Sequence, residues 1–243
     1  MGKAKPNYLL EAVVNILTGL PKGKVLDLGC GSGDYSKRLS ELGFDVTASD
    51  MDSGRFQYHS SIPFKISNLN DALPFPANTF DYALFLEVIE HIYNPLFVVE
   101  QISNIIKPNG LLILSTPNIL NIGSRIRFFF EGNFDFFREP ILDYHKIFPQ
   151  ALQNMHVVAW RYQELEYLLF KNNLRVEKTH TDLIKPQLRF LSFMLKPLIA
   201  MQCWKKERRA LKKGGVDFRR INRILLSDEL FLGRHLILQA RKT

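Results

Sequence analysis

The chain has 243 residues, of which 46% are hydrophobic and 23% charged, with 14 Gly, 12 Pro and 2 Cys. This composition excludes a disordered, collagen-like or disulfide-stapled chain, and the length suits one large domain or one domain with an appendage. The formal net charge of +8 is unevenly distributed. Residues 1–180 carry 17 basic and 19 acidic residues (net −2), whereas residues 181–243 carry 15 and 5 (net +10). The positive charge therefore belongs to the last quarter of the chain.

Strands and helices are expected to alternate along most of the chain. An amphipathic helix is predicted within residues 1–20. The elements expected after it are strand 24–28, helix 33–42, strands 44–49, 64–67 and 80–86, helix 95–107, strand 111–115, irregular residues 118–155, helix 162–172, and strands 174–180 and 234–241. Alternation of this kind predicts an α/β fold with a doubly wound, mainly parallel sheet.

A glycine loop, Gly29-Cys30-Gly31-Ser32-Gly33, follows the first expected strand. Glycines let the backbone turn sharply and bring a ligand against main-chain amides at a helix N-terminus. A dinucleotide fingerprint would need a third glycine where Asp34 stands. Asp27 precedes the loop and would repel a pyrophosphate, whereas it suits a ligand with an ammonium group. Asp50 ends the second expected strand and can accept hydrogen bonds from both hydroxyls of a ribose.

These residues and three later motifs resemble the class I S-adenosylmethionine-dependent methyltransferases. The later motifs are NLNDALPF at 68–75, FD at 80–81 and IKPNG at 106–110. The resemblance implies a seven-stranded Rossmann-like sheet and S-adenosylmethionine as cofactor. It also implies that the cofactor is bound by Asp27, Gly29, Cys30, Gly31, Gly33, Asp50, Met51, Asn68, Leu69 and Glu87. Asn68 departs from the family pattern, which often has Asp beside the adenine.

An acid-acid-histidine string, Glu87-Val88-Ile89-Glu90-His91, follows the strand at 80–86. It is similar to the string of ubiquinone-pathway O-methyltransferases and small-RNA 2′-O-methyltransferases, in which such residues can hold a divalent metal. We expect Glu90 and His91 to be catalytic. A spacing of three puts Glu87 and Glu90 on one side of a helical turn, and these groups suit Mg²⁺ or Mn²⁺.

A further metal ligand would come from downstream, with His156 as the first choice and His145 as the second. An alternative interpretation needs no metal. In that case Glu87 helps to bind the cofactor, while Glu90 and His91 cap the following turn.

Six phenylalanines lie between residues 128 and 137. Such a segment is too apolar for a solvated loop. Either the rings pack onto the core as a small helical lid, with most of them buried, or they line an apolar acceptor site. Their position after the strand at 111–115 favours an acceptor with a lipid, aromatic or prenyl part.

The basic segment is an insertion before the last strand. We divide the chain into a core at 1–180, the insertion at 181–233 and the last core strand at 234–243. Residues 190–204 are largely apolar and end at Trp204, and the next basic residues are Lys205, Lys206, Arg208, Arg209, Lys212 and Lys213. This pattern is typical of a helix that lies in a membrane interface. A lid with a solvated basic helix and an RNA or polyanion site remain alternatives.

The sequence therefore predicts an S-adenosylmethionine-dependent methyltransferase that acts on an oxygen atom of a small-molecule, glycan or lipid-linked acceptor. The alternatives are an RNA 2′-O-methyltransferase and a non-catalytic cofactor-binding regulator. A disulfide at Cys30 would obstruct the glycine loop, so we expect a reducing, cytoplasmic location. Peripheral contact with the inner face of the membrane is expected through residues 190–213.

Overall fold

A computed structural model describes residues 7–138, 155–212 and 218–243. Its elements are α1 (Tyr8–Thr18), β1 (Lys24–Leu28), α2 (Asp34–Glu41), β2 (Asp45–Asp50), β3 (Phe64–Ile66), β4 (Phe80–Leu86), the 3₁₀ turn η1 (Ile89–His91), α3 (Pro95–Ile105), β5 (Ile106–Pro117), α4 (Ile122–Glu131), α6 (Tyr162–Lys171), β6 (Leu174–His180), α7 (Gln187–Lys212), α8 (Arg219–Leu225), α9 (Asp228–Leu232) and β7 (His235–Lys242).

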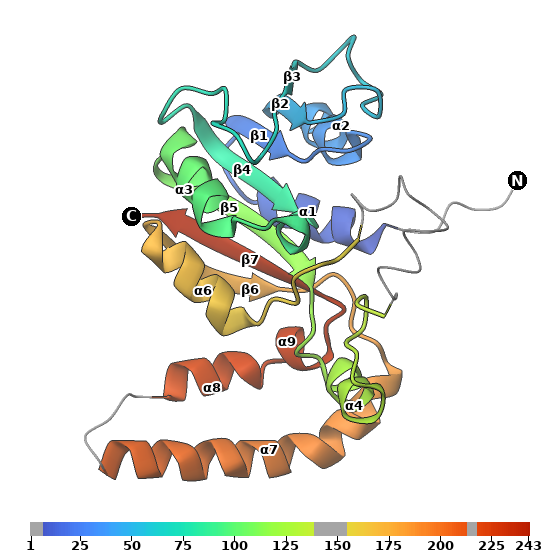
Figure 1. Cartoon of the computed structure of the whole chain (residues 1–243), viewed down its shortest axis with the longest axis vertical. Coiled ribbons are helices and arrows are strands. Elements are labelled where there is room, and N and C mark those ends of the chain that lie inside the picture. Colours follow the sequence, from blue (N-terminus) through green and yellow to red (C-terminus); the bar gives the residue numbers. More distant parts are fainter. Residues whose placement is uncertain (1–6, 139–154, 213–217) are drawn as a thin grey trace, which may run out of the picture.

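The seven strands form one sheet in the order β3-β2-β1-β4-β5-β7-β6 (Figure 1). β7 runs antiparallel to both of its neighbours, β5 and β6, and the other neighbouring strands are parallel. The predicted doubly wound, mainly parallel fold is thus confirmed. The strand order reverses between β1 and β4, and the crevice outside the carboxyl ends of these strands is where open sheets of this kind bind ligands.

Helices cover both faces of the sheet. Successive residues of a strand point to opposite faces, so neighbouring residues enter different apolar cores. In β5, Leu111 belongs to the core cluster that includes α1 and α2, and Leu112 to the cluster that includes α3 and α6. Strands buried on both faces read as continuous apolar runs, as 82–86 and 111–114 do. This rigid sheet fixes the positions of the loops at its carboxyl edge.

Several predicted elements differ from the structure, among them the strand expected at 111–115, because β5 spans Ile106–Pro117. Helix α3 ends at Ile105, two residues earlier than expected, because Pro108 disfavours a helical conformation at Lys107. The segment expected to be irregular contains α4, whose first turn is capped by the Asn121 side chain, which accepts a hydrogen bond from the N–H of Ser124 at 2.9 Å. Residues 139–154, including His145, lie outside the described residues.

The insertion begins and ends at the carboxyl edge of the sheet, because β6 runs parallel to β5 and β7 runs back. Its long helix, α7, lies beyond β6 together with α8 (Figure 1). A separate apolar cluster holds α7 in place: this helix packs against Ile122 of α4 and against Phe231 and Leu232 of α9. None of the helices in the described ranges has the length and hydropathy needed to cross a bilayer.

Candidate active site

The glycine loop is built to approach a ligand with its backbone. Gly29, Gly31 and Gly33 have φ values of +73°, +52° and +88°, a region that L side chains rarely adopt. The N–H of Gly29 donates to the carbonyl of Ser49 at 2.8 Å, and the N–H of Gly31 donates to Oδ2 of Asp50 at 2.9 Å. The loop is thereby tied to the end of β2, and Asp50 lies at the expected place in the crevice.

Asp27 is a buried carboxyl group beneath this loop. Its Oδ2 accepts a 2.6 Å hydrogen bond from the hydroxyl of Ser36. Burial raises the pKa of Asp27 to about 6, and the nearby carboxylate of Asp50 adds to the increase. A cationic ligand beside Asp27 would favour its ionised form. The role of Asp27 toward an ammonium group stays a prediction.

The other expected cofactor residues lie around the same crevice with different exposure. Cys30 is buried in the loop, whereas Met51 is more than half exposed just after β2. Asn68 is exposed after β3, where its Oδ1 accepts hydrogen bonds from the backbone and side chain of Asn70. Leu69 is partly buried against the core.

Glu87 does not share a helical turn with Glu90, contrary to the expectation from spacing. The 3₁₀ turn begins only at Ile89, and Glu87 itself has a φ of +53°. Its Oε1 accepts a 2.7 Å hydrogen bond from the hydroxyl of Ser115, and its Oε2 lies 3.4 Å from Nε2 of His235. Burial raises the pKa of Glu87, although His235 and Ser115 act in the opposite direction.

Three of the predicted metal ligands gather at this edge. One ligand atom from each of Glu90, His91 and His156 lies within 4.8 Å of the other two. Nδ1 of His91 is 2.7 Å from the carbonyl oxygen of Met155, and Nδ1 of His156 is 2.9 Å from that of Phe136. A carbonyl oxygen only accepts, so both Nδ1 atoms carry hydrogen and both Nε2 atoms keep a free lone pair when the rings are neutral.

Glu90 is the most confined member of this cluster. Its side chain is fully buried, Oε2 accepts a 3.1 Å hydrogen bond from Thr116, and Oε1 has no hydrogen-bond partner. Burial, followed by the charge of Glu87, raises the pKa of Glu90 to about 8. Burial disfavours the charged form of His91 too, and for an imidazole this lowers the pKa. Oε1 of Glu90 is thus a buried oxygen without a partner, 3.8 Å from Nε2 of His156. A bound cation or water molecule would satisfy such an oxygen.

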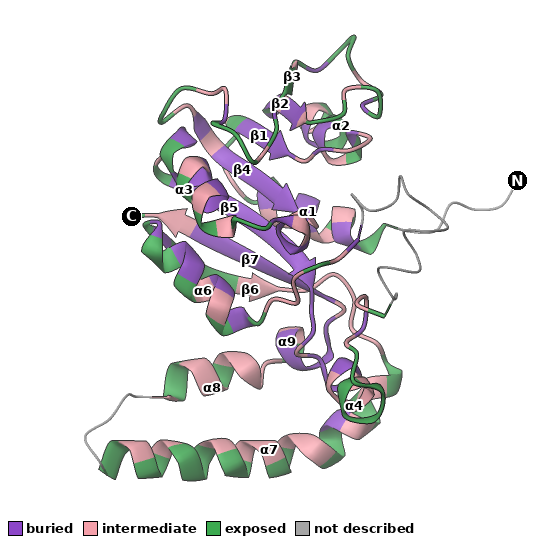
Figure 2. Ribbon diagram, in the orientation of Figure 1, coloured by how far each residue is buried: buried purple, intermediate pink, exposed green. Residues whose placement is uncertain are grey.

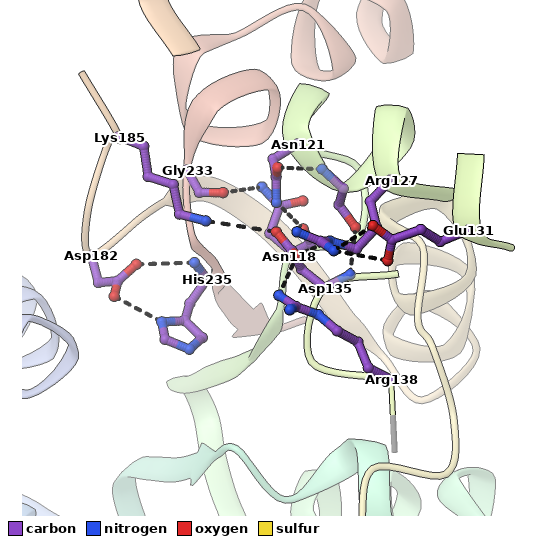
Figure 3. Close-up of polar contacts among 11 residues, drawn as sticks. Asn118, Asn121, Arg127, Glu131, Asp135, Arg138, Asp182, Lys185, Gly233 and His235 are labelled. Atoms are coloured by element: carbon purple, nitrogen blue, oxygen red, sulfur yellow. Dashed lines mark hydrogen bonds and ion pairs between the residues drawn. The ribbon is translucent and has the colours of Figure 1, made fainter. Parts of the chain in front are cut away.

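A second polar chain was not predicted from the sequence. Nδ1 of His235 donates to Oδ2 of Asp182 at 2.7 Å, and its backbone N–H donates to Oδ1 at 2.9 Å (Figure 3). Because Nε2 of His235 lies beside Glu87, this imidazole links the side chains of Asp182 and Glu87 at the carboxyl ends of the strands. Burial opposes ionisation of Asp182, but the bonds from His235 outweigh it and lower the pKa. The order of the strands could have predicted this pair. Asp182 follows the strand at 174–180 and His235 begins the last strand, so an antiparallel pairing of the two strands brings these residues together.

The phenylalanine segment is split between the site and the surface. The expectation that most of its rings are core is wrong, because none of the six is buried and Phe129 and Phe130 are 81% and 77% exposed. The ring of Phe136 lies 5.3 Å from that of His235, and the ring of Phe137 lies 5.4 Å from that of His156. Two rings of the segment therefore line the imidazole cluster.

The loop that carries these two rings is anchored by a buried acid. Asp135 accepts hydrogen bonds from Arg127 at 2.7 Å and Arg138 at 2.9 Å, and Nζ of Lys185 lies 3.6 Å away (Figure 3). Burial would raise the pKa of Asp135, but these cations lower it. Since Lys185 belongs to the insertion, Asp135 links the insertion to the loop that lines the site.

The fold, the glycine loop and the placement of Asp50 define a class I S-adenosylmethionine-dependent methyltransferase. The chain belongs to the methyltransferase domain family, whose model matches residues 3–179. Its cofactor is accordingly S-adenosylmethionine.

Ubiquinone biosynthesis O-methyltransferases from several bacteria are among the curated relatives. The protein from Xanthomonas campestris pv. campestris (strain B100) is 31% identical over 129 residues, which cover 48% of this chain and 54% of the relative. The protein from Glaesserella parasuis serovar 5 is 34% identical over 134 residues, covering 48% and 57%. The chain thus spans about half the length of the curated relatives it matches.

Solved structures share the fold over nearly the whole chain. An S-adenosylmethionine-dependent methyltransferase from Archaeoglobus fulgidus has a TM-score of 0.58 and 14% identity, covering 95% of this chain and 90% of that one. A methyltransferase from Methanosarcina mazei has a TM-score of 0.51 and 17% identity, covering 94% and 96%. At such identities the likeness concerns the fold alone.

Proposed function

We propose that this protein transfers the methyl group of S-adenosylmethionine to an oxygen atom of a small-molecule, glycan or lipid-linked acceptor. The observation that carries the proposal is the position of the Glu90–His91–His156 cluster, with two free Nε2 atoms, directly beside Phe136 and Phe137. A proton acceptor next to an apolar aromatic wall suits an acceptor with a hydroxyl group on an apolar or aromatic part. The curated relatives are named O-methyltransferases, which supports oxygen as the methylated atom.

The reaction requires that the acceptor oxygen be aligned with the methyl group and that the acceptor hydroxyl lose its proton. The sulfonium is an activated donor, so holding the acceptor oxygen in line with the methyl group supplies much of the acceleration. The oxygen–carbon bond forms as the sulfur–carbon bond breaks, and S-adenosylhomocysteine leaves. We assign the hydroxyl proton to Nε2 of His91, whose Nδ1–H is held by the carbonyl of Met155. The neighbouring imidazole of His156 is oriented by the carbonyl of Phe136, and Oε1 of Glu90 lies 3.8 Å from its Nε2.

In the alternative in which Nε2 of His91 is a ligand and not the proton acceptor, the same atoms fit a divalent metal ion. Glu90 supplies an unpartnered carboxylate oxygen, and His91 and His156 supply Nε2 atoms whose rings are fixed by backbone carbonyls. Glu87 is engaged with Ser115 and His235 and lies outside this set. Two imidazoles and one carboxylate favour Mn²⁺ over Mg²⁺. When bound, such an ion would lower the pKa of a coordinated acceptor hydroxyl.

The test compares methyl incorporation from labelled S-adenosylmethionine into lipid, glycan and RNA fractions of cells. We expect label in the lipid or glycan fraction, and a loss of about 10²–10⁴-fold for His91→Ala. Tyr93→Ala, which changes an exposed side chain two residues away, is the matched control. Label confined to RNA would instead establish the RNA 2′-O-methyltransferase. Cofactor binding without label in any fraction would indicate a regulator.

A separate measurement addresses the metal. Elemental analysis of the purified protein, and activity after EDTA treatment with and without added Mn²⁺, should show a bound ion and a reversible loss of activity. His156→Ala should reduce the bound metal, whereas Tyr93→Ala should not. Full activity after EDTA with no metal found would refute the metal site and leave His91 as the direct base.

A further inference from the structure

Helix α7 carries an apolar stripe that faces away from the protein. Phe190 and Phe193 are 74% and 80% exposed. The exposed apolar residues that continue the stripe are Met194, Leu198, Met201 and Trp204. Their spacings of three and four place them along one side of the helix. Exposed residues accompany α7 along its length in Figure 2.

The opposite side of α7 is the one that packs on the protein. Leu188, Leu191, Leu195 and Ile199 contact the cluster of Ile122, Phe231 and Leu232. The side chain of Ser192 is buried in the same part of the helix. The helix is therefore held in place without using its apolar stripe. Large exposed apolar patches of this kind mark interaction surfaces.

Positive charge accompanies the stripe. Residues 187–212 contain seven basic residues and one acidic residue, Glu207. Lys205, Lys206, Arg208, Arg209 and Lys212 follow the stripe in the last turns of α7 and are exposed. The guanidinium of Arg208 lies 4.7 Å from the ring centroid of Trp204. Trp204 thus stands at the boundary between the apolar and the basic part, as tryptophan does at the level of lipid headgroups.

We propose that the exposed face of α7 docks onto an anionic lipid surface. The apolar side chains would enter the boundary between headgroups and acyl chains, and the basic residues would contact the anionic headgroups. The charge of the segment complements such a surface. The same charge opposes the pairing of this face with a second copy of itself. The lack of a helix that could span a bilayer in the described ranges agrees with a helix lying in the plane of the surface.

A neighbouring helix presents further rings. Phe129 and Phe130 of α4 are exposed, and α4 packs against α7 through the cluster of Ile122 and Leu188. The proposal concerns a binding surface, so its readout is independent of the acceptor and of catalysis.

Vesicle flotation of the full chain tests the proposal. We expect recovery with phosphatidylcholine vesicles that contain 30% phosphatidylglycerol, and little recovery with phosphatidylcholine alone or at 0.5 M NaCl. Phe190→Ser with Phe193→Ser should weaken binding about tenfold or more for each ring removed. Lys205→Glu with Lys206→Glu should abolish the preference for anionic vesicles. Phe170→Ser, an equally exposed ring on α6, is the matched control and should bind as the unmodified protein does.

Circular dichroism and light scattering accompany each variant, so that loss of folding or a change of oligomeric state is recognised. Equal binding to neutral and anionic vesicles, or none to either, would overturn the proposal. A dimer that the double phenylalanine variant converts to a monomer, without vesicle binding by either form, would assign the face to a second copy. RNA binding that the lysine variant removes, again without vesicle binding, would assign it to a polyanion.

Discussion

Replacing Asp27 by Asn should make the protein more stable and a weaker binder of its cofactor. Burial raises the pKa of Asp27 from 3.8 to about 6 in the folded, cofactor-free protein. The folded state therefore binds this proton more tightly than the unfolded state does. Below about pH 4 the group is neutral in both states and carries no penalty. As the pH rises from about 4 to 6, the unfolded state releases this proton while the folded state keeps it, so the free energy of unfolding falls; above about pH 6 both states are ionised and the penalty stays constant.

The size of the effect follows from the shift in pKa. At roughly 1.4 kcal/mol per unit, the penalty reaches about 3 kcal/mol at pH 8, and about half of it is already present at pH 5. Asn keeps one acceptor oxygen for the hydroxyl of Ser36, which donates to Asp27 at 2.6 Å, but its NH2 cannot accept from the backbone N–H of Ser36, so the full penalty sets an upper limit to the gain. We therefore expect Asp27→Asn to raise the free energy of unfolding by at most about 3 kcal/mol at pH 8, with a smaller gain at pH 5.

Urea unfolding at pH 5, 6.5 and 8 without cofactor measures this gain, and calorimetry with S-adenosylhomocysteine measures affinity. Affinity should fall, because the ligand's ammonium group loses its carboxylate. Asp34→Asn removes an exposed carboxylate from the same loop and is the control. A stability gain that does not depend on pH, or a variant that loses stability and affinity together, would refute the reasoning.

Three further predictions concern the site. Asp50→Asn should weaken the binding of S-adenosylhomocysteine by about tenfold or more in calorimetry, because its charge-assisted bonds to the ribose weaken. In Gly33→Ala, the new Cβ would lie 2.4 Å from the ring of Phe56 at a φ of +88°, so urea unfolding should show a loss of about 1–3 kcal/mol. Gly19→Ala, with open space around it, should show no such loss. His235→Asn should lower the urea midpoint by the equivalent of about 2 kcal/mol or more, because two carboxyl groups lose their shared partner. An unchanged midpoint would contradict that connection.

The sheet and the cofactor edge could be predicted because their signals are local. The run at 80–86 is apolar except at Asp81, and β4 has these bounds. Asp50 stands where its strand ends, and its carboxylate meets the loop at Gly31. Each of these features depends on a few adjacent residues and on the rule that parallel strands end at one edge. Their arrangement in space then followed from the order of the elements alone.

The acceptor side could be predicted only in part, because its geometry depends on contacts between distant residues. Glu87 adopts a positive φ and pairs with Ser115 and His235, which lie 28 and 148 positions away. Helical spacing could not foresee this. The phenylalanines were misjudged for a similar reason. Burial of Phe129 depends on what surrounds α4, and composition carries no information on that.

The insertion contacts the candidate site and also carries the exposed stripe of α7, and this has a consequence for any attempt to shorten the protein. Its first residues include Asp182, which holds His235, and Lys185, which lies beside Asp135. The side chain of Asn118, at the end of β5, donates to the carbonyls of Leu230 and Gly233 and so fixes the returning segment. Removing the insertion would leave His235 without its carboxylate and Asn118 without these acceptors. The basic segment, although it lies outside the sheet, is therefore part of what shapes the candidate site, and its apolar stripe must be tested by substitution rather than by deletion.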